Sequence, residues 1–176
     1  MPKAPGRDVN AGRREMQIRD EQAKDQDAVR EIVAAEFDTG AEADFVDSVP
    51  RLVSLVADDD GRIVGHILLS PVSVDGKPDA KLTGVVSLAV VPDRQGEGIG
   101  SALMRAGLDR CRQLGCDGVV ALGHADYYGR FGFSPASRFG LRFTYQLPED
   151  AFLALELRPA ALEGKTGTVN HLAALR

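Results

Sequence analysis

The pattern of apolar and polar positions divides the chain into strands and helices. Short apolar runs bounded by turn residues predict seven strands, at 16–19, 52–57, 62–72, 82–91, 118–122, 141–145 and 151–157. Apolar residues at helical spacing predict helices over 28–37 and 42–49, and a longer helix of about four turns that begins at Ile99. A short helix is expected to carry Tyr127 and Tyr128.

The strand 82–91 is expected to lie at the centre of the sheet. It is apolar at nearly every position, which indicates that both of its faces are covered. The turn at 58–61 predicts an antiparallel hairpin of the two strands that flank it. The strand 118–122 is reached from the long helix and is therefore expected to run parallel to 82–91 through a right-handed crossover. The chain is predicted to be an α/β protein with three layers, a mixed sheet and helices on both faces.

A glycine-rich loop joins the central strand to the long helix. Gly96, Gly98 and Gly100 lie at the start of this helix. The first N–H groups of a helix have no acceptor within it, and the helix dipole adds partial positive charge. Because glycine lacks a Cβ, an anion can approach these amides closely. The loop therefore predicts a phosphate cradle built from backbone.

The spacing of the glycines excludes two common nucleotide-binding loops. A P-loop needs a lysine after its glycines, and none follows here. A dinucleotide fingerprint reads G-x-G-x-x-G, whereas residues 96–100 read G-x-G-x-G.

The loop instead matches the pattern Q/R-x-x-G-x-G/A through Gln95, Gly98 and Gly100. It resembles the coenzyme A loop of the Gcn5-related N-acetyltransferases (GNAT). The segment 127–133, Tyr-Tyr-Gly-Arg-Phe-Gly-Phe, is similar to the one that follows the fifth strand in that family. The resemblance covers about 16–168 and is greatest to a less characterised, YhbS-like branch of predicted N-acetyltransferases.

The resemblance implies a GNAT-like fold, with a mixed, mostly antiparallel central sheet of about seven strands in which strands four and five are parallel and splayed. In the family, the pantetheine arm of acetyl-CoA bonds along the fourth strand. The residues that match the arm site are Ser87, Leu88 and Val90. The residues that match the pyrophosphate site are Gln95, Gly96, Gly98, Ile99, Gly100 and Ser101.

The reaction implied is direct attack of an amine on the acetyl thioester in a ternary complex. The backbone N–H of Leu88 matches the donor to the oxyanion, a role worth about 3 kcal/mol. Tyr128 matches the general acid that protonates the leaving thiolate, a role worth about 10² to 10⁴ in rate. The alternative for Tyr128 is a packed aromatic with a satisfied hydroxyl, and Tyr127 is interpreted as a core residue.

The base that deprotonates the amine is not evident from the sequence. Many relatives carry a glutamate on the central strand, but residues 85–91 contain neither a carboxylate nor an imidazole. Water-relayed deprotonation is one alternative. The other candidates are His66, His124, Glu42, Asp44 and Asp47.

Charge and composition limit the partners that we expect. The formal net charge is −5, and residues 1–15 carry four basic and two acidic side chains, so the rest of the chain carries −7. An acidic body disfavours nucleic acid and is compatible with a cationic amine. No apolar run approaches the ~18 residues of a membrane span, and the N-terminus lacks the apolar region of a signal peptide. We expect acetyl-CoA as co-substrate, a small-molecule or peptide amine as acceptor, no nucleic-acid or membrane partner, and a cytoplasmic location; a homodimer stays open.

Residues 1–15 are predicted to be a disordered basic tail, and 16–176 a single N-acetyltransferase domain. Cys111 and Cys116 are five residues apart, which fits neither a metal site nor a redox pair, so reduced thiols and no metal are expected. The alternative function is an acyl-CoA-binding sensor or interaction module without transferase activity.

Overall fold

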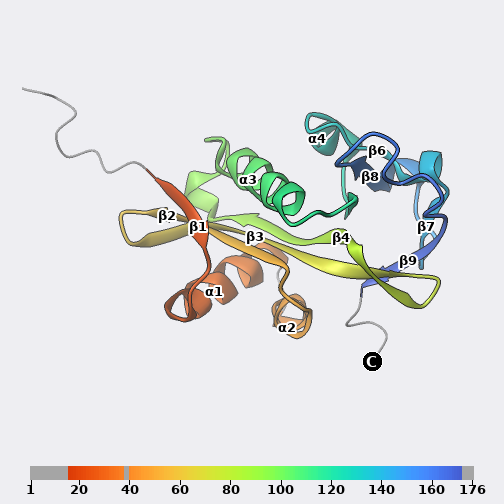
Figure 1. Cartoon of the computed structure of the whole chain (residues 1–176). Helices are drawn as coiled ribbons and strands as arrows, with labels where there is room; N and C mark the ends of the chain where they lie inside the picture. The colour runs from red at the N-terminus through yellow and green to blue at the C-terminus, as the bar shows by residue number, and fades with distance from the viewer. Residues whose placement is uncertain (1–15, 38–39, 172–176) are drawn as a thin grey trace, which may run out of the picture.

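The computed structural model of the chain describes residues 16–37 and 40–171. A nine-stranded sheet forms the middle layer (Figure 1). Helices α1 (Gln26–Phe37) and α2 (Gly40–Ser48) lie on one side of it and α3 (Ile99–Gln113) on the other, while the short α4 (Ala125–Gly129) lies near β6. The strands are β1 (Gln17–Asp20), β2 (Val53–Asp59), β3 (Arg62–Val74), β4 (Lys77–Val90), β5 (Gly118–Leu122), β6 (Ser134–Pro135), β7 (Leu141–Phe143), β8 (Phe152–Glu156) and β9 (Gly167–His171).

The main path of the sheet runs β1-β2-β3-β4-β5-β8-β6, and β9 pairs with both β3 and β7. Its pairs are antiparallel except β4–β5 and β7–β9, which are parallel. The predicted fold, a mixed and mostly antiparallel sheet with helices on both faces, is confirmed. The sheet has nine strands rather than about seven, because the sequence pattern missed two. Strand β6 spans only two residues, and β9 has Val169 as its one large aliphatic residue.

The two helical layers pack on opposite faces of the central strands. Helix α3 buries its apolar stripe, including Leu103, Met104 and Leu108, against β2, β3 and β5. A smaller cluster beneath α1 and α2 contains Val33 and Leu68. Each fully buried side chain of this size contributes roughly 1.5–3 kcal/mol. The core therefore fixes β3 and β4, the strands on which the candidate site is built.

Strands β4 and β5 separate soon after they meet, as predicted. They pair only over Leu82–Gly84 and Gly118–Val120. Beyond Gly84, β4 keeps its pairing with β3 but leaves β5, which pairs with β8 along its other edge throughout. The ladder between β3 and β4 also has an irregularity after Ser87, where Val86 has no partner on β3. A gap therefore opens along the last residues of β4, beside the start of α3.

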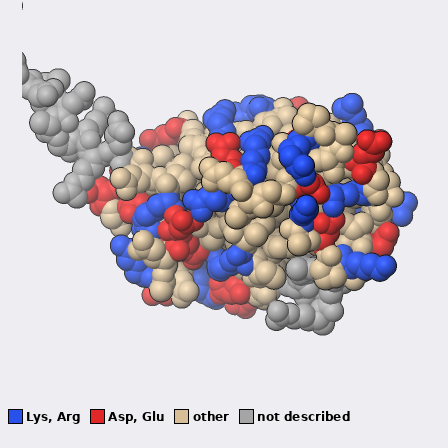
Figure 2. All heavy atoms as spheres, in the orientation of Figure 1, with Lys and Arg blue, Asp and Glu red and all other residues tan. Residues whose placement is uncertain are grey.

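The predicted tail, residues 1–15, lies outside the described residues. Of the helices that the structure describes, none has both the length and the apolar character needed to cross a membrane. On the face in Figure 2, basic and acidic side chains are interspersed.

Candidate active site

An open cavity of about 910 Å³ lies along the gap between β4 and β5. Its walls come from the end of β4, the loop that follows, the first turn of α3, and α4. All nine residues that matched the coenzyme A site line this cavity, and Tyr128 lines it with them. The nine are Ser87, Leu88, Val90, Gln95, Gly96, Gly98, Ile99, Gly100 and Ser101.

The start of α3 presents open backbone amides to the cavity. Gly98 is the N-cap of this helix, has a φ of +85°, and no side chain caps the first turn. A Cβ placed on Gly98 would find no atom within 4 Å, so the space in front of it is free. The first turn carries no acidic residue that would repel an anion. These features fit a phosphate cradle.

The open edge of β4 also offers backbone groups that no neighbouring strand pairs, although the Val90 carbonyl accepts a hydrogen bond from the Gln95 side chain. The Val91 amide donates to the carbonyl of Val64 on β3, at 2.9 Å. Because successive residues of a strand direct their backbone groups to opposite edges, those of Val90 and Leu88 face away from β3. That edge is the one that β5 has left, so the Leu88 N–H points into the gap. It is a fixed donor of the kind that an oxyanion needs.

Ser87 contributes a buried hydroxyl to the cavity wall. Its residue is only 2% exposed, and its Oγ has no hydrogen-bond partner among the described residues. Leaving such a group unpaired costs about 1–3 kcal/mol, which a bound polar molecule can recover. The hydroxyl is therefore consistent with a ligand in the gap.

Tyr128 reaches the cavity from α4 and is packed firmly. Its residue is 8% exposed, and its ring lies 5.3 Å from that of Phe133 and against Gly123 at the end of β5. Burial, with a smaller effect of Tyr127, raises the pKa of Tyr128 to about 12. The hydroxyl is thus protonated at neutral pH, and no described residue hydrogen-bonds it. It is free to donate a proton.

Tyr127 packs against the core, as interpreted from the sequence, but it also lines the cavity. Its hydroxyl lies 3.4 Å from the position of a Cβ on Gly100, beside the start of α3. The guanidinium of Arg130 lies over its ring, 4.7 Å from the centroid. Arg130 and Arg94 line the cavity and add positive charge near the cradle, although Arg94 is held by Asp59 and Glu97.

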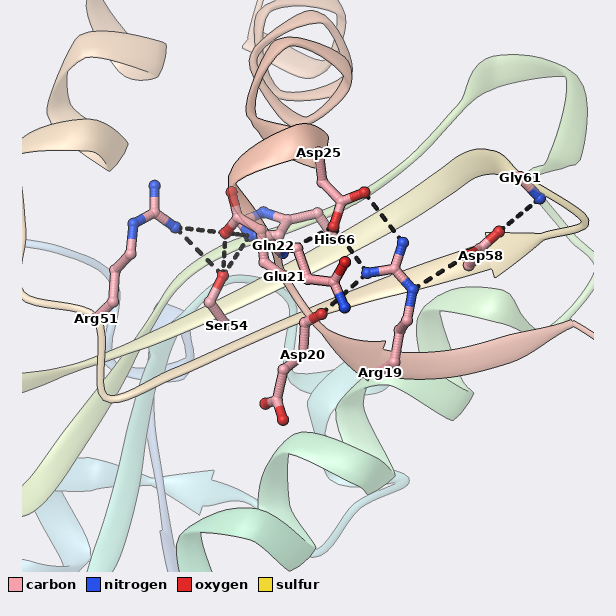
Figure 3. Close-up of polar contacts among 10 residues, drawn as sticks. All are labelled: Arg19, Asp20, Glu21, Gln22, Asp25, Arg51, Ser54, Asp58, Gly61 and His66. Carbon is pink, nitrogen blue, oxygen red and sulfur yellow. Dashed lines mark hydrogen bonds and ion pairs between the residues drawn. The ribbon is translucent and has the colours of Figure 1, made fainter.

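His66, one of the five candidate bases, belongs to a separate buried cluster (Figure 3). Its Nε2 is 3.0 Å from the hydroxyl of Ser54, and the carboxylate of Glu21 accepts hydrogen bonds from Ser54 and Arg51. His66 shares its face of β3 with Leu68, which packs beneath α1 and α2. It does not line the cavity, so the structure does not support it as the base.

The other candidates are also placed elsewhere where they can be seen. Asp44 and Asp47 form ion pairs with Arg30 on the outside of the α1–α2 layer. His124 is exposed at the start of α4 and borders a different, smaller cavity. The side chain of Glu42 lies outside the described part of the structure.

The sequence reasoning missed two ionisable residues of the cavity wall, Glu36 and His171. Glu36 lies in the last turn of α1, where the periodicity shows only an ordinary polar face. His171 ends β9, whose apolar pattern is too weak to reveal a strand. Only the pairing of β9 with β3 brings His171 beside the central strand.

No metal site is visible in the described ranges, where no three His, Cys, Asp or Glu side chains gather around a common point. Cys111 and Cys116 are free and buried. Burial raises the pKa of the Cys111 thiol to about 12, so it is a structural residue of the core rather than a reactive one.

Comparison with known proteins places this geometry in a family. Residues 15–133 match the acetyltransferase (GNAT) family. The chain is 34% identical over 161 residues to the uncharacterised N-acetyltransferase YhbS of Escherichia coli K12, covering 89% of this chain and 96% of YhbS. It is 38% identical over 130 residues to the uncharacterised N-acetyltransferase YjhQ of the same strain, covering 69% and 72%.

Two solved structures at 34% identity share the fold. The structure of E. coli YhbS in complex with CoA has a TM-score of 0.83, with 92% of each chain covered. A GNAT family acetyltransferase from Brucella melitensis in complex with acetyl-CoA has a TM-score of 0.75, covering 91% of this chain and 98% of that one. The splayed strands, the glycine loop at the start of α3 and these matches together lead to one conclusion: the chain belongs to the GNAT family of acetyltransferases.

Proposed function

We propose that this protein transfers the acetyl group of acetyl-CoA to an amine by direct attack in a ternary complex. The observation that carries the proposal is the convergence of three features on one cavity. These are the amides at the start of α3, the open edge of β4 at Leu88, and the hydroxyl of Tyr128. The relatives solved with CoA or acetyl-CoA support the choice of co-substrate.

The cavity suits each part of acetyl-CoA. The α3 amides behind Gly98 and Gly100 would hold the pyrophosphate, with Arg130 adding positive charge. Backbone groups of Leu88 and Val90, and the hydroxyl of Ser87, would hold the pantetheine arm. These neighbouring groups are already rigid parts of a strand and a helix, so little order has to be imposed on them when the ligand binds.

Acetyl-CoA supplies an activated acetyl thioester. The N–H of Leu88 donates to the carbonyl oxygen as negative charge develops on it. The hydroxyl of Tyr128 donates its proton to the sulfur as the C–S bond breaks, and regains it from solvent. The products are an N-acetylated amine and the free thiol of CoA.

The two free, buried thiols of the protein suit a reducing compartment, so we propose the cytoplasm as its location.

Two measurements test the proposal. Calorimetric titration with acetyl-CoA measures binding. Thiol release is then followed with acetyl-CoA and a panel of small primary amines, lysine peptides and peptides with free N-termini. We expect saturable binding and thiol release that depends on one class of amine. Tight binding without release on any amine would instead indicate an acyl-CoA-binding module.

A further inference from the structure

His171 lies at the point where the gap between β4 and β5 opens. It ends β9 and pairs with Val72 of β3. Its ring packs on the central strand at Gly84, where an added Cβ would lie 3.1 Å from Cε1 and 3.6 Å from Nδ1 of the imidazole. Gly84 is also the last residue of β4 that pairs with β5. The imidazole therefore stands beside the central strand and in the wall of the cavity that holds Leu88 and Tyr128.

The imidazole of His171 is held by aromatic contacts rather than by hydrogen bonds. Its ring centroid lies 5.7 Å from that of Phe45 on α2 and 6.4 Å from that of Phe143 on β7, both in edge arrangements. No described residue hydrogen-bonds a ring nitrogen, and Nδ1 is buried. Buried polar atoms are nearly always paired, so an unpaired imidazole in a cavity wall calls for a functional explanation.

The surroundings of His171 favour the neutral ring. Burial lowers its pKa below the ordinary 6.5, so at pH 7 one ring nitrogen carries a lone pair. On β3 and β4, residues 72–74 and 82–90 contain no ionisable side chain. On the other neighbouring elements, Glu36 of α1 lines the same cavity, α2 carries Glu42, Asp44 and Asp47, and β7 carries Arg142. The two aspartates pair with Arg30, and burial is the only cause of the shift.

We propose that His171 is the general base of the transferase. It accepts a proton from the acceptor ammonium, so that the neutral amine can attack the thioester. The inference rests on the proposed function. Gly84 and Leu88 are four residues apart, about 13 Å along a strand, so the proton passes through water in the cavity. The N–H bond of the ammonium breaks and its proton reaches the imidazole. The freed nitrogen lone pair attacks the thioester carbonyl, the C–S bond breaks, and Tyr128 protonates the sulfur. The second proton that the nitrogen loses as it becomes an amide passes to cavity water, and the imidazolium returns its own proton to solvent.

This assignment accounts for the missing base of the central strand. Residues 85–91 offer no carboxylate, and none of the candidates whose side chains are described lines the cavity. His171 lies on β9, far from β4 in the sequence, yet it places a neutral imidazole beside β4. The assignment also gives a role to an imidazole that lines the cavity and has no hydrogen-bond partner among the described residues.

The test compares His171→Phe with His124→Gln. Phenylalanine keeps the edge contacts with Phe45 and Phe143 but removes both nitrogens, so it separates packing from proton transfer. His124 is exposed and lies outside this cavity, which makes it the matched histidine control. With the amine that gives the fastest thiol release, kcat/KM is measured from pH 5 to 9. Acetyl-CoA affinity of each variant is measured by calorimetry.

We expect His171→Phe to bind acetyl-CoA like wild type and to lower kcat/KM at pH 7 by about 10²-fold, within the usual range for a general base. In the wild type and in His124→Gln, kcat/KM should fall as pH drops through the lowered pKa of His171. In His171→Phe this acid limb should be absent.

A second readout needs no turnover. The chain has three histidines, so an NMR titration of the free protein gives three ring signals, and His171 is the one missing from His171→Phe. Its pKa should lie below 6.5 and coincide with the acid limb of kcat/KM, which reports the free enzyme. If the acid limb of kcat/KM is retained in His171→Phe, or if its pKa disagrees with the pKa from the NMR titration, His171 is not the base, while the proposed function still stands. A wild type that binds acetyl-CoA but acetylates no amine overturns the proposed function itself.

Discussion

The side chain of Gln95 donates a hydrogen bond to the carbonyl of Val90, with Nε2 3.1 Å from the oxygen. Gln95 begins the glycine loop and Val90 ends β4, so this bond ties the loop to the strand. The second N–H of this amide and the backbone N–H of Gln95 stay available to a phosphate. The cradle and the open edge of β4 are thereby held in a fixed relation before a ligand arrives, which lowers the entropic cost of binding.

The cradle can be tested with two glycines of similar geometry. Gly98 and Gly76 have φ values of +85° and +78°, and a Cβ on either would meet no atom within 4 Å. Valine at either site should therefore cost a similar strain, about 1–3 kcal/mol. We expect Gly98→Val to lose acetyl-CoA binding, because the branched side chain covers the α3 amides. Gly76→Val, in the turn between β3 and β4, should bind normally. Calorimetry measures both.

Urea unfolding of the same two variants checks that their stabilities fall alike. If Gly98→Val and Gly76→Val bind acetyl-CoA equally well, the phosphates do not lie at the start of α3.

Removal of the Tyr128 hydroxyl should slow turnover without disturbing the fold. Phenylalanine keeps the contacts with Phe133 and Gly123. We expect Tyr128→Phe to lower kcat about 10- to 1,000-fold, a loss of roughly 1.4–4 kcal/mol in transition-state stabilisation. A thiolate is a fair leaving group without help, which favours the lower end. Steady-state kinetics on a confirmed acceptor provide the measurement.

Tyr145, which is 71% exposed and does not line the cavity, supplies the control, and Tyr145→Phe should leave kcat unchanged. Tyr127→Phe should act on the KM for acetyl-CoA, since its hydroxyl lies beside the start of α3. Loss of kcat in Tyr127→Phe but not in Tyr128→Phe would exchange the roles of the two tyrosines.

Because the pKa of Tyr128 is about 12, the acid form persists through neutral pH and is lost only as pH rises toward that value.

The cluster of Glu21, Arg51, Ser54 and His66, shown in Figure 3, should contribute stability that depends on pH. Burial of Glu21 acts to raise its pKa, but hydrogen bonds from His66 and Ser54 outweigh it, and the pKa is lowered. A carboxyl with a lowered pKa stabilises the fold above its unfolded value, and this contribution disappears as pH falls through the folded one. We expect Glu21→Gln to cost about 1–3 kcal/mol at pH 7 and less at pH 4, which is below the ordinary value of 4.5 where the contribution begins to be lost.

Urea unfolding at the two pH values measures this difference. Glu163→Gln, at an exposed position, is the control and should leave stability unchanged at both. An equal loss for Glu21→Gln at pH 7 and pH 4 would mean that the charge of Glu21 is not what stabilises the cluster.

The two cysteines should behave as protected thiols. Cys111 and Cys116 are buried, and burial raises the pKa of both, that of Cys111 to about 12. A thiol reagent should therefore react slowly with the folded protein and titrate two thiols after denaturation. Fewer than two thiols in the denatured, unreduced protein would reveal a disulfide and contradict the prediction. Elemental analysis should find no bound metal.

The features that the sequence reveals are those with strong local signals. The apolar strand before Pro92, the glycines up to Gly100 and the tyrosine segment each occupy a continuous stretch, and the structure brings them to one cavity. Their order along the chain also predicts that β4 and β5 are parallel, because one helix joins them, whereas their splay was implied by the resemblance to the family. The contacts and roles assigned to individual residues stay predictions.

The wall of the cavity that β9 forms has no such local signal in the sequence. His171 meets Gly84 through pairing between strands that are distant in the sequence, and β9 shows no clear apolar alternation. The sequence places His66 on the strand 62–72 but does not tell which face of that strand carries it. That face lies under α1 and α2, where Glu21 and Ser54 satisfy the imidazole Nε2.

The position of β9 places the residues proposed for the amine on a different part of the chain from the residues that match the coenzyme site. The family match ends at residue 133 and includes the glycine loop, β4 and Tyr128, whereas β7 and β9 follow it. These later strands place Phe143 and His171 on the side of the gap away from the cradle. If the proposed transfer takes place in this cavity, substitutions in β7 and β9 would change how the amine enters without changing the residues that match the coenzyme site. Donor and acceptor preference could then evolve, or be engineered, independently within a single cavity.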